Sequence, residues 1–156
     1  MKSTFKYGLL LLTILVAASC SRKKDTFVNR GWHSVTGYYN TMFNGKEALI
    51  EGKEALEASF IDDYWNILPV ERLAIEERII APGEKKNQSF ERAEDKATKA
   101  IQKHSMNIDG EEVNPVMDEA FIMLGKARYF DGRFVPAQEA FNYVLRRYPT
   151  SNSITE

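Results

Sequence analysis

The chain has few of the residues that catalytic and metal sites usually contain. It has one cysteine and two histidines among its 156 residues. A single cysteine excludes a disulfide within the chain, so the stability of the folded protein has to come from packing. His33 lies beside Trp32, and His104 lies near the end of an expected helix, where a cationic side chain suits the helix dipole. We therefore expect neither histidine to be a metal ligand or a catalytic base.

A strong charge of one sign is also lacking. The sum of Lys and Arg is 21 and that of Asp and Glu is 22, which gives a formal net charge of −1. Nucleic-acid-binding domains usually show a large basic excess, so we exclude nucleic acid as a partner. Adjacent carboxylates occur at Asp62-Asp63, Glu76-Glu77 and Glu111-Glu112. Neighbouring residues of a helix point about 100° apart, so such pairs seldom converge on one substrate.

Sequence motifs for chemistry are absent as well. The chain contains no glycine-rich phosphate loop and no nucleophile motif. We therefore expect no enzyme, no cofactor, no metal and no small-molecule substrate. The hydrophobic content of 44% and the aromatic content of 12% nevertheless predict a packed chain.

Long apolar runs are missing except near the N-terminus. Lys2 and Lys6 precede an apolar stretch that ends in small residues, over positions 8–19, and Cys20 follows it. A charged start, an apolar middle and a small-residue exit are the layout of a secretory signal. The apolar stretch is about half of the roughly 20 residues needed to span a bilayer. We therefore expect a cleaved signal peptide over residues 1–19 and no permanent transmembrane helix.

Cys20 follows the small residues directly and resembles the cysteine of a bacterial lipobox. In that class of precursor the chain is cut before the cysteine, and the thiol and the new amino group receive acyl chains. Ala17 departs from the pattern, because a larger aliphatic residue is usual three places before the cysteine. Each buried methylene contributes about 0.8 kcal/mol, so several acyl chains on one residue hold a protein on a membrane. An ordinary signal with an unrelated cysteine and an uncleaved anchor are the alternatives.

Residues 20–30 are expected to form a lipidated, flexible tether. The cations Arg22, Lys23 and Lys24 are either solvated or touch anionic headgroups, where each contributes about 1 kcal/mol. Surface-exported lipoproteins of the Bacteroidetes usually carry acidic residues at this point. Ser21 resembles the residue that sorts lipoproteins to the outer membrane. These features predict a lipid anchor in the outer membrane, with the protein on the periplasmic face.

Two predicted helices follow one another over residues 118–149. Gly132 suits the turn between them, Pro149 suits the end of the second, and Asn114-Pro115 suits the start of the first. The small and apolar residues at helical spacing are Ala120, Phe121, Leu124, Ala127, Phe130, Phe134, Ala137, Phe141, Val144 and Leu145. The pattern predicts a helical hairpin.

This hairpin resembles a tetratricopeptide repeat, a helix–turn–helix unit of about 34 residues. The positions that match are Phe121, Leu124, Gly125, Ala127, Tyr129, Gly132, Phe134, Ala137, Phe141, Val144 and Pro149. Gly125 and Ala137 would allow the two helices to approach closely, and Arg128 departs from a position that is usually tyrosine. An unrelated helical hairpin is the alternative.

The spacing of the second helix of this hairpin occurs once more upstream. Phe90, Ala93, Ala97, Ala100 and Ile101 are spaced as are Phe134, Ala137, Phe141, Val144 and Leu145. Residues 89–149 are therefore expected to hold tetratricopeptide-like helices with one full repeat at 118–149. A loop is expected over 105–114, with its turn at Asp109-Gly110.

Residues 31–88 are expected to form a divergent helical region. Positions 36–44 and 46–60 each show an apolar helical face, and Asn44-Gly45 predicts a break between the two helices. Residues 61–88 are too apolar for a free linker, and one short helix is expected around 70–80.

These segments together resemble the PorW/SprE lipoproteins. The likeness is carried by residues 29–33, 39–49 and 93–106 and by the repeat at 118–149. Those proteins are tetratricopeptide lipoproteins of the Bacteroidetes type IX secretion and gliding-motility machinery. Members of the family continue into many more repeats. The resemblance therefore implies the N-terminal portion of such a protein, in which residues 150–156 are a tail or the start of a further repeat.

The expected fold class is all-α, with antiparallel helical hairpins of α-solenoid type behind a signal peptide and a tether. Stacked hairpins leave a concave face that suits peptides or partner helices. Lys126, Arg128, Tyr129 and Asn142 are the candidate partner-binding residues on such a face. Ordinary solvent exposure is the alternative for each of them.

The resemblance implies a non-enzymatic scaffold that binds other proteins of the secretion and gliding machinery. A glycan-binding outer-membrane lipoprotein of the starch-utilisation type is the alternative, since those proteins also use tetratricopeptide hairpins. They usually carry acidic residues after the cysteine and longer insertions, so the basic residues 22–24 favour the scaffold. A small enzyme of unknown activity is a third hypothesis.

Overall fold

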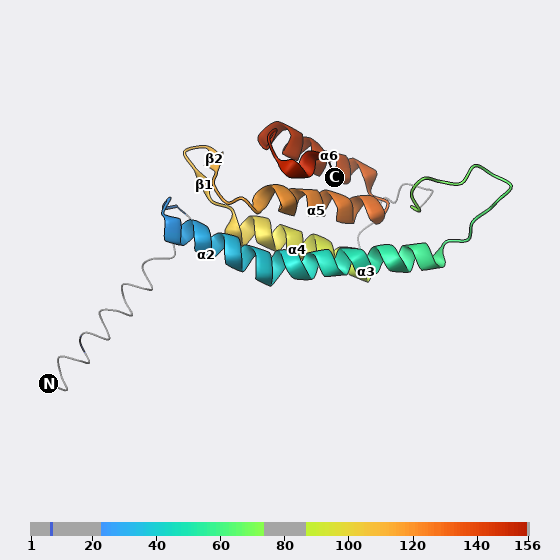
Figure 1. Ribbon diagram of the computed structural model, residues 1–156, viewed down its shortest axis with the longest axis horizontal. Coiled ribbons are helices and arrows are strands. Elements are labelled where there is room, and N and C mark those ends of the chain that lie inside the picture. Colours follow the sequence, from blue (N-terminus) through green and yellow to red (C-terminus); the bar gives the residue numbers. More distant parts are fainter. Residues whose placement is uncertain (1–6, 8–22, 74–86, 156) are drawn as a thin grey trace.

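Helices packed side by side make up most of the described chain (Figure 1). The computed structural model describes Tyr7, residues 23–73 and residues 87–155. The elements are α2 (Phe27–Gly37), the π-helical turn η1 (Tyr38–Met42), α3 (Phe43–Ser59), α4 (Gln88–His104), β1 (Asn107–Ile108), β2 (Glu111–Glu112), α5 (Met117–Phe130), α6 (Phe134–Arg147) and the 3₁₀ turn η2 (Asn152–Thr155). The all-α expectation is confirmed.

Cys20 and, apart from Tyr7, the expected signal peptide over 1–19 lie outside the described residues. Within the described part of the chain, no helix combines the length and the apolar character needed to cross a bilayer. Of the helix expected around 70–80, only residues 70–73 are described, and they are not helical.

A single long rod, formed by α2, η1 and α3, corrects two of the sequence predictions. α2 begins at Phe27, where the Thr26 hydroxyl caps it by accepting a hydrogen bond from Asn29 N (3.3 Å), so positions 27–30 of the expected tether are helical. α3 runs through Asn44-Gly45 without the predicted break. A Cβ at Gly45 would lie 2.5 Å from the terminal methyl of Met123 on α5. Gly45 therefore permits close helix packing, and it does not mark a turn.

The π-helical turn keeps one face of the rod buried along its whole length. Asn29, His33 and Gly37 are buried at intervals of four residues. An α-helix has 3.6 residues per turn, so residues spaced by four turn gradually away from a single face of the helix. In η1 the Phe43 amide donates to the carbonyl of Tyr38, five residues earlier, which widens this turn and absorbs the drift. The buried line then continues through Met42 into α3.

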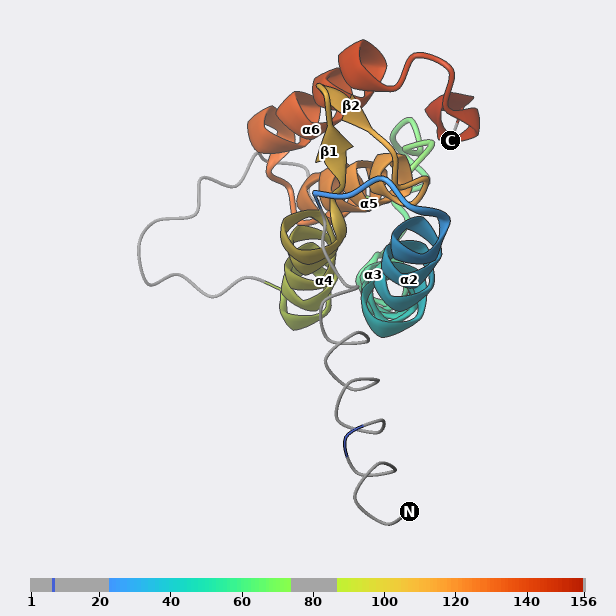
Figure 2. The same ribbon diagram turned by 90° about the vertical axis from the view of Figure 1, so that its left-hand side faces the viewer.

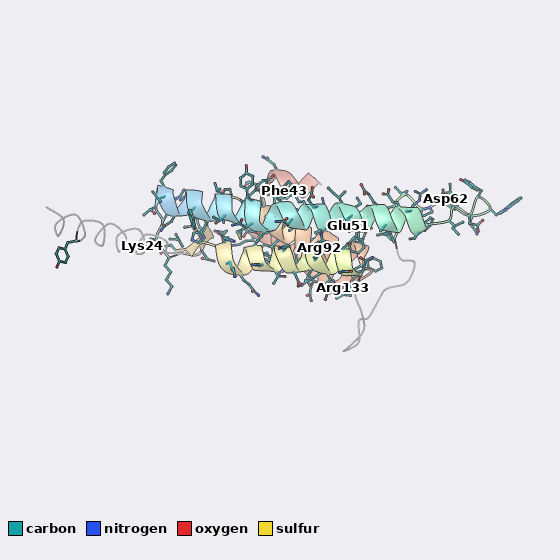
Figure 3. The ribbon with its side chains drawn as sticks, turned by 90° about the horizontal axis from the view of Figure 1, so that it is seen from below. Lys24, Phe43, Glu51, Asp62, Arg92 and Arg133 are labelled. Atoms are coloured by element: carbon teal, nitrogen blue, oxygen red, sulfur yellow. The ribbon has the colours of Figure 1, made fainter. Side chains whose placement is uncertain are left out.

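The helices are arranged in layers (Figure 2). The rod and α4 lie side by side, α5 packs across them, and α6 packs on α5. Seen from below, α3 and α4 run alongside each other, and Arg92 Nη1 of α4 lies 3.3 Å from Glu51 Oε2 of α3 (Figure 3). The predicted helix over 90–104 is therefore present as α4, within the bundle.

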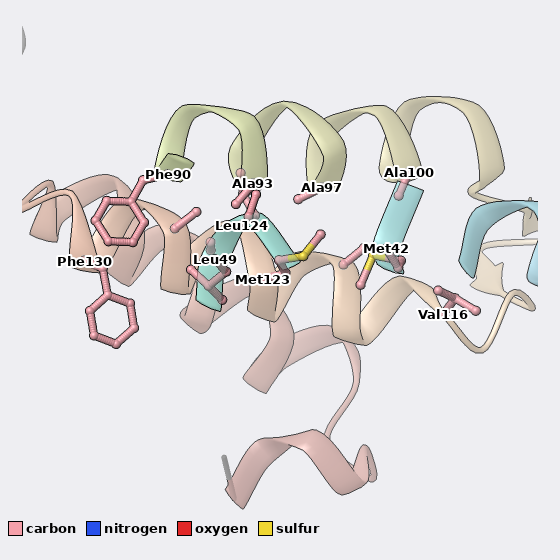
Figure 4. Packing of buried hydrophobic residues seen from close by; sticks show 14 of the residues in the cluster. Met42, Leu49, Phe90, Ala93, Ala97, Ala100, Val116, Met123, Leu124 and Phe130 are labelled. Atoms are coloured by element: carbon pink, nitrogen blue, oxygen red, sulfur yellow. The ribbon is translucent and has the colours of Figure 1, made fainter. Parts of the chain in front are cut away.

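The core lies between the rod, α4 and α5 (Figure 4). Ala93, Ala97 and Ala100 of α4 are fully buried, and their small side chains let the neighbouring helices approach closely. Phe90 stacks on Phe130 with ring centroids 6.1 Å apart. The gap between the layers is filled by Met42, Leu49, Met123 and Leu124.

The predicted hairpin over 118–149 is formed by α5 and α6. Gly132 takes a φ of 76° at the turn, the left-handed conformation that glycine favours. A Cβ at Gly125 would lie 2.4 Å from the Phe141 ring, which confirms the close approach of the two helices. The loop expected over 105–114 contains a two-stranded hairpin, β1 with β2, and turns at Asp109 (φ 51°) and Gly110 (φ 88°) as predicted.

Two glycines of the rod should respond oppositely to alanine. Gly52→Ala would place a methyl group 2.5 Å from the buried Phe90 ring, whereas a Cβ at Gly31 would meet no side chain and no other element within 4 Å. Alanine is favoured over glycine in a helix by about 1 kcal/mol, and overpacking a core costs about 1–3 kcal/mol. In urea denaturation we expect a higher free energy of unfolding for Gly31→Ala and a lower one for Gly52→Ala. A stabilised Gly52→Ala variant would contradict the close contact between α3 and α4.

Candidate functional site

An open apolar groove runs between α3, α5 and α6, and we name it the α5 groove. Its main part is a cavity of about 590 Å³. The residues that line it are Leu49, Ile50, Lys53, Glu71, Ile122, Lys126, Tyr129, Phe130, Phe141, Val144, Leu145, Ser153 and Ile154. A smaller hollow of about 260 Å³ shares Leu49, Ile50, Ile122 and Lys126 with it and extends the groove toward Lys46 and Glu119.

Helical periodicity places the walls of the α5 groove. Ile122, Lys126 and Tyr129 are spaced by four and three residues, so they share one face of α5. Phe141, Val144 and Leu145 share one face of α6 in the same way. The third wall comes from α3, which is far away in the sequence, and only the folded chain brings it to the other two.

Lysines surround the apolar floor. Lys46 Nζ lies 2.8 Å from Glu119 Oε2, and Lys53 Nζ lies 4.6 Å from the centroid of the Phe130 ring. The Tyr129 hydroxyl donates a hydrogen bond to Glu71 Oε2 (3.3 Å). Burial, with the Glu71 charge beside it, raises the pKa of the Tyr129 phenol. Tyr129 therefore stays a neutral hydrogen-bond donor on the groove wall.

The four candidate partner-binding residues separate into two groups. Lys126 and Tyr129 line the α5 groove. Arg128 lies on another side of α5, where Nε is 2.9 Å from Glu94 Oε1 and Nη1 donates to the Pro136 carbonyl (3.1 Å). Asn142 is exposed on α6, and its carbonyl accepts a hydrogen bond from Arg146 Nε (3.2 Å). Neither Arg128 nor Asn142 lines the groove, and Arg128 is used to join helices within the chain.

A buried ionic network fixes the end of the hairpin where α5 turns into α6. Glu94 of α4 forms ion pairs with two arginines: its Oε2 lies 2.6 Å from Arg133 Nη2, and its Oε1 lies 2.9 Å from Arg128 Nε. Arg133 Nε also lies 2.9 Å from Asp131 Oδ2. Desolvation lowers the pKa of Arg133, but the hydrogen bonds and charges of Glu94 and Asp131 outweigh it and raise that pKa overall. The sequence analysis missed this network, because its members look like ordinary surface charges until the helices are packed.

The two histidines meet although 71 residues separate them in the chain. Their Nδ1 atoms are 3.5 Å apart, and the Thr36 hydroxyl lies 3.4 Å from His104 Nδ1. This contact joins α2 to α4. Within residues 23–73 and 87–155, no group of three or more His, Cys, Asp or Glu side chains is placed to hold a metal ion.

The α5 groove combines an apolar floor with a charged rim. The rim carries Lys46, Lys53 and Lys126 together with Glu71 and Glu119. No family model matches the chain, and no curated protein matches it significantly.

Proposed function

We propose that this chain is a lipid-anchored, non-enzymatic scaffold of tetratricopeptide type. It binds proteins of the type IX secretion and gliding apparatus at the periplasmic face of the outer membrane. The α5 groove is the observation that carries the proposal, because an apolar surface open to solvent along three helices suits a protein partner. The signal-like segment before Cys20 supports the location, and the resemblance over residues 29–33 and 39–49 supports the apparatus.

Comparison of α4 with α6 supports a helix as the occupant of the groove. On α4, Ala97 and Ala100 are buried in the core cluster that α5 completes. The positions on α6 with the same spacing as Ala97, Ala100 and Ile101 are Phe141, Val144 and Leu145, and these line the open groove. The face of α4 that packs against α5 thus has a counterpart on α6, where Leu145 is 53% exposed next to the buried Val144. An amphipathic partner helix is the element that fits such a surface.

The charges around the groove favour an acidic flank on that helix. Lys46, Lys53 and Lys126 line the groove and its extension, together with Glu71 and Glu119. Opposite charges across an interface increase the association rate and select among partners more than they add affinity. We therefore expect binding to weaken with salt chiefly through the association rate.

A matched pair of substitutions on α6 tests the groove. Leu145 lines it and is 53% exposed, whereas Val135 lies outside it and is 57% exposed. Leu145→Glu would place a charge on the apolar wall, and losing a central apolar contact typically costs about 2 kcal/mol or more, which is over tenfold in affinity. We expect Leu145→Glu to abolish co-purification of secretion-apparatus proteins, and Val135→Glu to leave it intact. Circular dichroism of both variants checks that the helices are kept.

The same variants decide between the scaffold and its alternatives in cells. A deletion strain complemented with Leu145→Glu should lose secretion and spreading, while Val135→Glu should restore them. Normal secretion and spreading with Leu145→Glu would contradict a groove that serves this apparatus. Retention on immobilised starch or other glycans, lost in Leu145→Glu, would instead support the glycan-binding alternative.

A further inference from the structure

An exposed apolar stripe follows the outer side of the rod, and we name it the α2 stripe. Its residues are Val28, Trp32, Val35, Tyr39 and Phe43, each between 49% and 66% exposed. Phe27, at the start of α2, is 91% exposed. Single exposed apolar residues are normal on a protein surface, but a continuous line of large ones marks an interaction site.

The stripe is continuous because of the π-helical turn. Intervals of four, three and four residues hold Val28, Trp32, Val35 and Tyr39 on one face of the rod. The wide turn of η1 adds a residue before Phe43 and so returns Phe43 to the same line. The turn that keeps the inner face of the rod buried thereby also aligns the apolar side chains of its outer face.

We propose that the α2 stripe lies in the interfacial layer of the membrane that carries the Cys20 anchor, and thus forms a second attachment to the lipid. The proposal rests on the lipid anchor of the proposed function. The position of the stripe in the chain is its first support. From Cys20 to Phe27 the chain spans seven residues, which reach at most about 25 Å when fully extended. An anchored Cys20 therefore holds the start of the stripe within that distance of the lipid surface.

The chemistry of the stripe is the second support. Tryptophan and tyrosine combine an apolar ring with a polar atom and are enriched where lipid meets water. The segment between Cys20 and the helix contains the exposed cations Lys23 and Lys24, which attract anionic headgroups. A helix with an apolar outer face beside such cations has the character of helices that lie in the membrane interface.

Because the anchor holds the stripe next to the lipid surface, even a weak affinity of the stripe for lipid is sufficient for attachment. A surface held close to its ligand by a short tether binds at an effective concentration in the millimolar range, without any new contact. The stripe residues do not line the α5 groove. Attachment through the stripe would fix the orientation of the bundle on the membrane.

The fluorescence of Trp32 tests the proposal. The chain has two tryptophans, so Trp65→Phe leaves Trp32 alone, and Trp32→Phe leaves Trp65, which is 97% exposed, as the matched control. The mature chain from Cys20, which keeps all the described helices, is coupled through its sole cysteine to a maleimide lipid. The vesicles contain phosphatidylethanolamine and phosphatidylglycerol. We expect a blue shift of Trp32, its quenching by brominated acyl chains and its loss of access to iodide, with no such change for Trp65.

Several outcomes would overturn the inference. Trp32 that remains red-shifted and accessible to iodide on the coupled vesicles excludes the lipid surface. A blue shift that grows with protein concentration in the absence of vesicles assigns the stripe to a second copy of the chain. Mass spectrometry of the protein purified from its own membranes decides the lipidation of Cys20 separately. Since chemical coupling supplies the anchor in the vesicle experiment, failure of the stripe and failure of the proposed anchor are distinguishable.

Discussion

Replacing Glu94 with alanine is expected to lower the free energy of unfolding by about 3–5 kcal/mol, because it removes one partner from a buried ionic network. The Glu94 side chain is 12% exposed, and the Arg133 side chain that it pairs with at 2.6 Å is 11% exposed. Glu94 also holds Arg128 at 2.9 Å. The substitution would remove the carboxylate that the two guanidinium groups share. Arg133 would keep only Asp131 and Arg128 only the Pro136 carbonyl, so the desolvation of their charges would be offset only in part.

Chemical denaturation of Glu94→Ala and Asp95→Ala measures this effect. Asp95 is the next residue of α4 and is exposed, and a surface substitution of that kind usually changes stability by no more than about 0.5 kcal/mol. Should Glu94→Ala fail to fold, Glu94→Gln keeps an acceptor oxygen for the arginines and should give a measurable, intermediate loss. Equal stability of the Glu94 and Asp95 variants would contradict a structural role of the network.

The positions of α4, α5 and α6 could be predicted from the sequence because two local signals agree there. Helical periodicity defines the buried face of each helix. Gly132 marks the turn between α5 and α6, and Pro149 follows the end of α6. At Asn44-Gly45 the same signals disagree. Glycine there could mean a turn or a close contact, and only the neighbour Met123, from a distant part of the chain, decides for the contact.

The candidate site could be predicted only in part for the same reason. Lys126 and Tyr129 share a helix face, so a sequence can place them together. Arg128 lies two positions from Lys126, on another side of α5. The sequence does not show that Arg128 pairs with Glu94 of α4 on that side. The α3 wall of the groove, from Leu49 to Lys53, depends on the packing of a helix more than 70 residues away in the chain. Helical periodicity shows which residues of one helix share a face, but it does not show which distant helix packs against that face.

Replacing Cys20 with serine is expected to remove the protein from the outer membrane. Serine lacks the thiol that the lipid-modifying reaction requires, so the chain would carry no acyl groups. Stable membrane attachment usually needs two signals, such as acyl chains together with a polybasic or apolar surface. The α2 stripe alone would then bind lipid only weakly and would be lost on washing. Fractionation of cells, with fatty-acid labelling and intact-mass measurement, checks this prediction.

The matched control for the anchor is Ser19→Ala, which keeps a small residue before the cysteine. That variant should remain acylated and in the outer-membrane fraction. A Cys20→Ser protein that stays in this fraction and still carries fatty acid would show that the anchor lies elsewhere. Adding Trp32→Ser to Cys20→Ser separates the two attachments, because the weak binding to membranes before washing should fall only if the stripe contributes. Since Trp32 does not line the α5 groove, a loss of secretion that appears on adding Trp32→Ser reports the attachment of the scaffold and not its partner surface.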